Sequence, residues 1–161
     1  MLTMLQQQLA DAHGLAIAAA ETIDHVETRV RDPRLRRRLD ELRLDANEVR
    51  ARCLEAENGF GEESAEELLG HANTVSEKAA DLAASWFKAA TGPLEAWGFL
   101  SMGEAGEVAA WSALCSLAER DGRLAELAEW GLDVQRRHLA LALDSVPLLA
   151  ESFRPDAARW G

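Results

Sequence analysis

Three pairs of polar side chains, each with members three residues apart, are the part of this sequence best suited to chemistry. They are Asp45 with Glu48, Glu104 with Glu107, and Gln135 with His138. Residues three apart on a helix share a face. Helical bundles that hold two iron or manganese ions use inward-facing carboxylates and Glu-x-x-His pairs of this spacing. The pairs therefore indicate a metal site inside a bundle.

The pair on the 93–120 stretch faces the predicted core. Glu104 lies between Leu100 and Val108 on an apolar row, and Glu107 follows the adjacent row. A core-facing carboxylate is costly unless it is paired or bound to a metal. The alternative is a pair of boundary carboxylates that interact with arginine or water. His138 also follows an inward row, where a histidine satisfied by a hydrogen bond is the alternative to a metal ligand.

The metal site predicted in this way is incomplete. Gln135 stands where a Glu-x-x-His pair would have its acid, and a neutral amide is a poor ligand for iron. The inward row of the first helix reads Ala12, Ala16, Ala19 and Ala20, with no carboxylate until Glu21, although His13 lies one residue off that row. Any iron or manganese held here is expected to be mononuclear or weakly bound.

Apolar spacing and helix caps predict five helices and no strand. The expected ranges are 2–30, 33–58, 64–90, 93–120 and 123–146. Tight turns join the first helix to the second and the fourth to the fifth, so each pair should form an antiparallel hairpin. Residues 1–152 are expected to form one domain. Pro147 should kink or end the fifth helix, and residues 153–161 should fray.

The order and spacing of these stretches resemble the ferritin-like bacterial family of YciF type, which is associated with stress. Asp32-Pro33-Arg34-Leu35 is similar to the family's first turn, and Leu42–Glu48 to its second-helix acidic segment. Glu104–Trp111 and Gln135–His138 are similar to its later motifs. The resemblance implies a ferritin-like antiparallel four-helix bundle, with the 64–90 helix as the additional crossover helix. It also implies a homodimer and a di-metal site that uses Glu107, Glu104, Asp45, Glu48 and His138.

Composition restricts the partners of the chain. A net charge of −11 opposes binding to nucleic acid or anionic lipid, so we expect neither nucleic acid nor membrane as a partner. Six arginines between Arg29 and Arg38 form a local exception, either a solvated turn or an anion patch. Cys53 and Cys115 are expected to be free thiols. No signal peptide or membrane-spanning run is present, which favours the cytoplasm.

The sequence leaves three functions open. The first is a ferritin-like protein with a degenerate di-metal site that handles iron or peroxide under stress. The second is a metal-free interaction or scaffolding bundle that has lost the site. The third is a binder of a small molecule, with room provided by the alanine-rich row of the first helix. No Ser/His/Asp or Cys/His arrangement is readable, so we lean against an enzyme.

Overall fold

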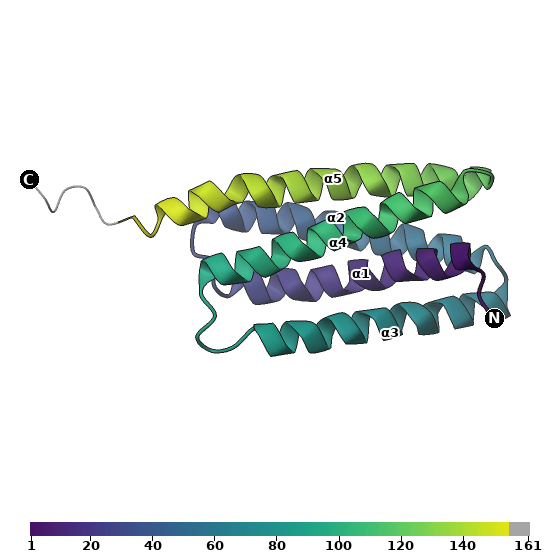
Figure 1. The fold of residues 1–161 in the computed structure, drawn as a ribbon, viewed down its shortest axis with the longest axis horizontal. Coiled ribbons are helices and arrows are strands. Elements are labelled where there is room, and N and C mark those ends of the chain that lie inside the picture. The colour runs from purple at the N-terminus through teal and green to yellow at the C-terminus, as the bar shows by residue number, and fades with distance from the viewer. Residues whose placement is uncertain (155–161) are drawn as a thin grey trace, which may run out of the picture.

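The computed structural model describes residues 1–154, and this part of the chain is an all-helical bundle (Figure 1). It contains five helices and no strand: α1 (Met4–Glu27), α2 (Pro33–Asn58), α3 (Glu62–Trp86), α4 (Pro93–Ala118) and α5 (Gly122–Glu151). The predicted all-α class is confirmed. None of the helices in the described part is long and apolar enough to cross a membrane.

Side-chain caps fix where three of the helices begin. Thr3 and Gln6 form a capping box at the start of α1. Asp32 accepts a hydrogen bond from the backbone N–H of Arg34, and Pro33 follows it as the first residue of α2. Asp121 accepts from the N–H of Leu124 at the start of α5. The connections are short, so consecutive helices run in opposite directions.

Helix α1 is the central element of the molecule. It packs against α2, α3 and α4, while α5 packs against α4 and α2. Helices α1, α2, α4 and α5 thus enclose a four-helix core. Helix α3 lies at the edge of the molecule beside α1 (Figure 1). At the closest approach of these two helices, a Cβ on Gly14 would lie 2.4 Å from the carbonyl oxygen of Ala72, so only glycine is accommodated there.

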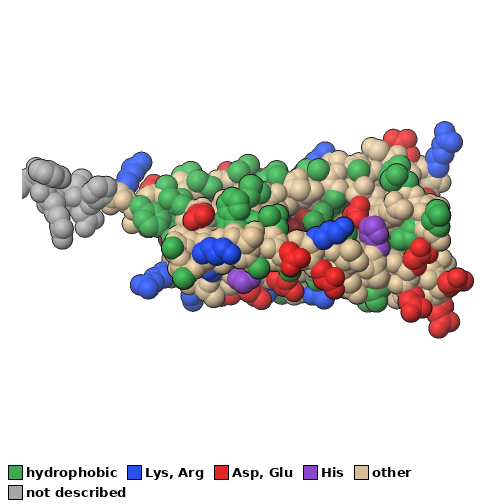
Figure 2. Space-filling view, turned by 60° about the horizontal axis from the view of Figure 1, so that its bottom comes forward, with side chains coloured by type: hydrophobic (Ala, Val, Ile, Leu, Met, Phe, Trp, Pro, Cys, Tyr) green, Lys and Arg blue, Asp and Glu red, His purple; other side chains and the backbone are tan. Residues whose placement is uncertain are grey.

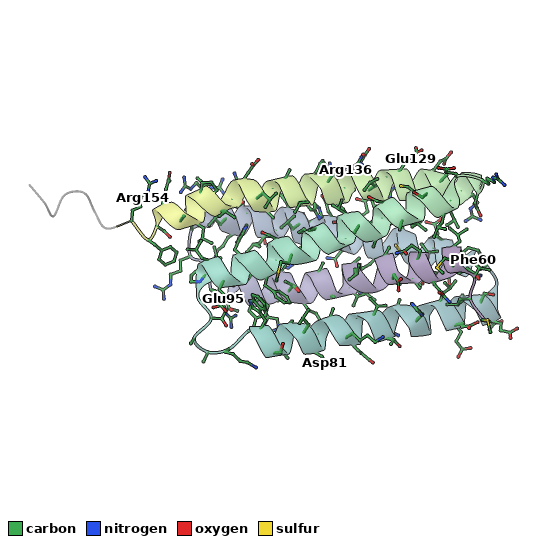
Figure 3. The ribbon with its side chains drawn as sticks, in the orientation of Figure 1. Phe60, Asp81, Glu95, Glu129, Arg136 and Arg154 are labelled. Carbon is green, nitrogen blue, oxygen red and sulfur yellow. The ribbon has the colours of Figure 1, made fainter. Side chains whose placement is uncertain are left out.

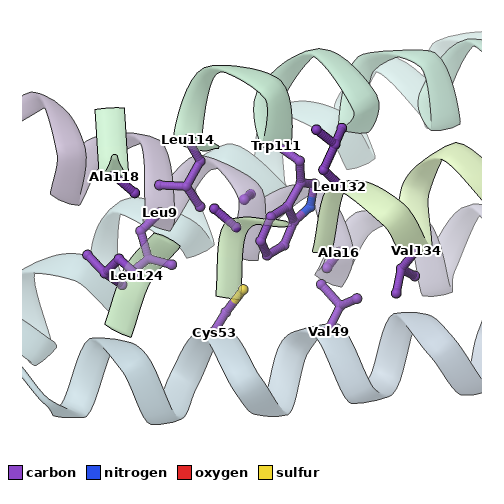
Figure 4. Packing of buried hydrophobic residues seen from close by; sticks show 12 residues of the cluster. Leu9, Ala16, Val49, Cys53, Trp111, Leu114, Ala118, Leu124, Leu132 and Val134 are labelled. Atoms are coloured by element: carbon purple, nitrogen blue, oxygen red, sulfur yellow. The ribbon is translucent and has the colours of Figure 1, made fainter. Parts of the chain in front are cut away.

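Two apolar clusters fill the four-helix core. In the first, the Trp111 ring of α4 lies among Ala16, Cys53 and Leu132, which come from three other helices (Figure 4). The second surrounds Trp97, whose indole N–H donates to the carbonyl oxygen of Ala142 at 2.9 Å. Polar side chains such as Asp81 and Arg136 point away from the core (Figure 3).

The structure corrects several helix boundaries. Helix α1 ends at Glu27 and not at residue 30, and α3 covers Glu62–Trp86 and not 64–90. The fifth helix continues through Pro147 to Glu151, so of the two effects expected of Pro147, a kink or an end, the end is wrong. Pro147 is exposed, while Leu149 beyond it is buried in the second cluster, and this packing holds the last turn helical. The expected fraying of the tail lies, from residue 155 onward, outside the described residues.

Candidate functional site

Helices α4 and α5 carry four polar residues into the core. Glu104, Glu107, Gln135 and His138 are only 1%, 3%, 1% and 5% exposed. Each pair has members three residues apart, and both members of each pair fall on the inward face of their helix. The two pairs therefore supply a buried polar cluster to a bundle that is otherwise apolar.

His138 lies between two carboxylates. Its Nε2 is 3.0 Å from Oδ2 of Asp45 on α2, and its Nδ1 is 3.4 Å from Oε2 of Glu104. Burial by itself would lower the pKa of His138, but the carboxylates of Glu104 and Asp45 outweigh it and raise that pKa. Arg137 approaches the same Asp45 oxygen at 3.6 Å from the solvent side. His138 therefore bridges α2 and α4, and its two carboxylate neighbours favour the protonated form of its ring.

Glu107 is a buried acid without a cation. No salt bridge to it exists in the described part of the chain, and its Oε2 has no hydrogen-bond partner. Burial raises its pKa well above the ordinary value, and the neighbouring Glu104 raises it further. Glu104 Oε2, Gln135 Oε1 and Trp111 Nε1 are also buried without a hydrogen bond. Such unsatisfied groups in a core are uncommon and call for an explanation.

The structure brings together only part of the predicted set of metal ligands. Glu48 is exposed and forms an ion pair with Arg52 on the same helix, so it does not join the cluster. Both ring nitrogens of His138 face carboxylates, which places Asp45 and Glu104 on opposite sides of the ring. Across residues 1–154, no three His, Cys, Asp or Glu side chains are grouped closely enough to hold a metal ion.

A second buried pair was missed by the sequence reasoning. His13 Nδ1 contacts both oxygens of Glu57 at 2.9 and 3.0 Å, and the two residues are 4% and 0% exposed. Glu57 continues the row of Val49 and Cys53 by four residues, and this was the signal that could have found it. Burial raises the pKa of the Cys53 thiol, and Glu57 and Glu107 raise it further. Glu57, unlike Glu107, has a partner.

An apolar groove runs between α1, α3 and α4, with a volume of about 310 Å³. We call it the α1/α3/α4 groove. Small residues of α1, including Ala18 and Ala19, line it together with Leu82 of α3 and Phe99 of α4. Glu104 and Glu107 line it as well. The two acids of the polar cluster are therefore also wall residues of a groove.

The groove is open along α4 because two of its wall residues are glycines. A Cβ placed on Gly103 or Gly106 would meet no atom within 4 Å. At the C-terminal end of α3, close in sequence to the groove residue Leu82, the rings of Trp86 and Phe87 pack on Phe99 with centroids 5.3 and 5.1 Å apart. Leu82 and Met102 are 57% and 52% exposed, so the rim of the groove is apolar. Hydrophobic side chains lie exposed on the face of the molecule that turns α3 toward the viewer (Figure 2).

The arginine cluster has structural contacts at four of its six positions. Arg34 pairs with Asp32, and Arg36 donates to the backbone oxygen of Val30. Arg38 donates to Ser145, and Arg29 donates to the backbone oxygen of His25 and lies over the Phe87 ring. These contacts tie the α1–α2 turn to the helices around it.

Comparison with known proteins identifies no relative. No protein-family model matches the chain, and neither curated proteins nor solved structures give a match. What the chain does must therefore be argued from its own residues.

Proposed function

We propose that this chain is a small-molecule-binding helical bundle whose binding site is the α1/α3/α4 groove. One observation carries the proposal: Glu104 and Glu107 line an apolar groove while each keeps a buried oxygen without a hydrogen bond. Ligand sites are typically apolar concavities with a few convergent polar groups and perturbed pKa values. A volume near 310 Å³ suits a small ligand.

The ferritin-like organisation belongs to the same proposal. The order of the motifs supports it. So does the chain order, because α3 follows the α1–α2 hairpin and precedes the α4–α5 hairpin, as a crossover helix would. In this reading the positions that hold metal in such bundles contribute instead to the wall of the groove. The homodimer and the cytoplasmic location are part of the proposal and rest on the sequence alone.

Calorimetry with three small amphiphiles tests the proposed function. Octanol, octylamine and octanoate share one apolar tail and differ in the charge of the head group. We expect at least one of them to bind saturably. Gly106 lines the groove and a Cβ there would meet no atom within 4 Å, so we expect the added bulk of leucine in Gly106→Leu to abolish that binding. Gly98→Leu is the matched control, since Gly98 is an exposed glycine of α4 that does not line the groove. Binding that Gly106→Leu leaves intact, or no binding at all, rejects the groove as the site.

Metal handling is a second candidate, because Glu104, Glu107, Gln135 and His138 are buried together on α4 and α5. It is tested by elemental analysis of protein purified without chelator. Near-stoichiometric iron or manganese that is lost in Glu107→Ala would support it. Protein with no bound metal, and with unchanged stability after metal addition, would reject it in favour of the groove.

A further inference from the structure

We propose that the α1/α3/α4 groove binds an amphipathic organic cation, a primary amine with a short apolar tail, whose ammonium group contacts Glu104 and Glu107. This inference rests on the ligand-binding function proposed above and names the class of its ligand. It follows from three properties of the groove: its unmatched charge, its unmatched hydrogen-bond acceptors and its apolar length.

One buried acid of the core has no cationic partner in the described part of the chain, whereas the others do. Glu57 has His13 as its partner, and Asp45 has both His138 and Arg137. The same His138 also serves Glu104, at the longer distance of 3.4 Å. Glu107 has none. Burial without a partner disfavours the ionised form of Glu107 and raises its pKa, so an incoming cation would stabilise a carboxylate that no side chain of the described part supports.

The unmatched polar atoms also favour a donor. Of the two acids that line the groove, Glu107 has an Oε2 atom without any donor, and the Oε2 atom of Glu104 has only Nδ1 of His138, at 3.4 Å. An ammonium group carries three N–H donors and a positive charge, an alcohol carries one donor, and a carboxylate carries none. A carboxylate ligand would place a third acid beside the two that already line the groove. The groove therefore selects for an amine.

Apart from the two acids, the groove is suited to the apolar tail of an amphipathic ligand. Ala18 and Ala19 make a floor of small side chains, and Leu82, Phe99 and Met102 supply apolar walls. The acids lie on the α4 side, at 1% and 3% exposure, while Leu82 and Met102 stand at the exposed rim. A ligand with a charged head and an apolar tail matches this division between a buried polar end and an apolar wall.

The test compares head groups on one tail. Because charge-assisted hydrogen bonds exceed neutral ones by about 1.4 kcal/mol, octylamine should bind about tenfold more tightly than octanol at neutral pH. Octanoate should bind most weakly. Glu107→Gln keeps the shape of the side chain and removes its charge, so it should weaken octylamine about tenfold and leave octanol within about twofold.

The acidic surface of the protein could attract amines at other places, and two controls address this. Glu95→Gln removes one charge from an exposed position of the same helix and should leave octylamine affinity unchanged. Gly106→Leu should abolish octylamine binding, whereas Gly98→Leu should not. Equal affinity for octylamine and octanol, or equal losses in Glu107→Gln and Glu95→Gln, would overturn the cation inference. Groove binding of octanol alone would overturn it and leave the proposed function standing.

Discussion

Replacing Glu107 with leucine should stabilise the ligand-free protein. The carboxyl is 3% exposed, and its Oε2 has no hydrogen bond. A buried polar group left unsatisfied costs about 1–3 kcal/mol. Leucine removes that cost and adds apolar burial, while its imperfect fit to the site offsets up to about 1.5 kcal/mol. We expect a net gain of about 1–3 kcal/mol in the free energy of unfolding.

The gain should grow with pH. The pKa of Glu107 is raised in the folded state, whereas the unfolded side chain titrates near the ordinary value of 4.5. Between these two values the folded state binds the extra proton, so the free energy of unfolding falls as pH rises from about 4.5 through the folded pKa. Glu107→Leu lacks this loss. Its advantage over the wild type should therefore be larger at pH 8 than at pH 5.

Urea denaturation of protein refolded free of small molecules measures both effects. Glu57→Leu is the matched control: the same substitution at an equally buried acid on α2 that has a partner. It leaves His13 buried without that partner and should cost about 1–3 kcal/mol. If Glu107→Leu were neutral or destabilising at pH 8, Glu107 would have a stabilising partner and the argument for an unmatched acid would fail.

Two further predictions concern the packing around Trp111 and the two thiols. Gly131→Ala should lower the free energy of unfolding by about 1–2 kcal/mol in urea melts. The new Cβ would lie 2.2 Å from a Trp111 ring carbon, and this overpacking outweighs the better helix propensity of alanine. Gly98→Ala, where a Cβ meets no atom within 4 Å, should be stabilising, and similar effects of the two substitutions would contradict the packing. In native protein Cys115, which is partly exposed, should react with Ellman's reagent well before Cys53, which is 0% exposed. Equal rates for the two thiols would show that the core around Cys53 opens readily.

Sequence periodicity predicted which polar residues of α4 and α5 are buried, but it did not predict which acids of α2 lie in the core. Glu104, Glu107, Gln135 and His138 follow rows of large apolar residues, so their inward direction could be read from spacing alone. Glu48 could not be placed, because it lies at the margin of the α2 stripe, where either face is consistent with the pattern. Glu57 was missed because it lies beside the Asn58-Gly59 helix end, which is usually solvent-exposed.

The groove could not be predicted from the sequence. Its walls come from α3 and α4, and its width depends on how each of them packs against α1, which is a tertiary property. The alanine-rich row of α1 and the glycines of α4 show only that room exists there. The unmatched charge could be recognised only once His138 had been found to serve both Asp45 and Glu104.

The edge position of α3 has a consequence for the rate at which a guest enters and leaves. Helix α3 buries four of its 25 residues, whereas α1 buries nine of 24. Segments with little buried apolar surface open at lower free energy than the core around them. Helix α3 is therefore expected to open at a lower free energy than the four-helix core. Its opening would add a second route by which a guest enters and leaves, beside the exposed rim at Leu82 and Met102, and would shorten the residence time of a guest that the acids hold.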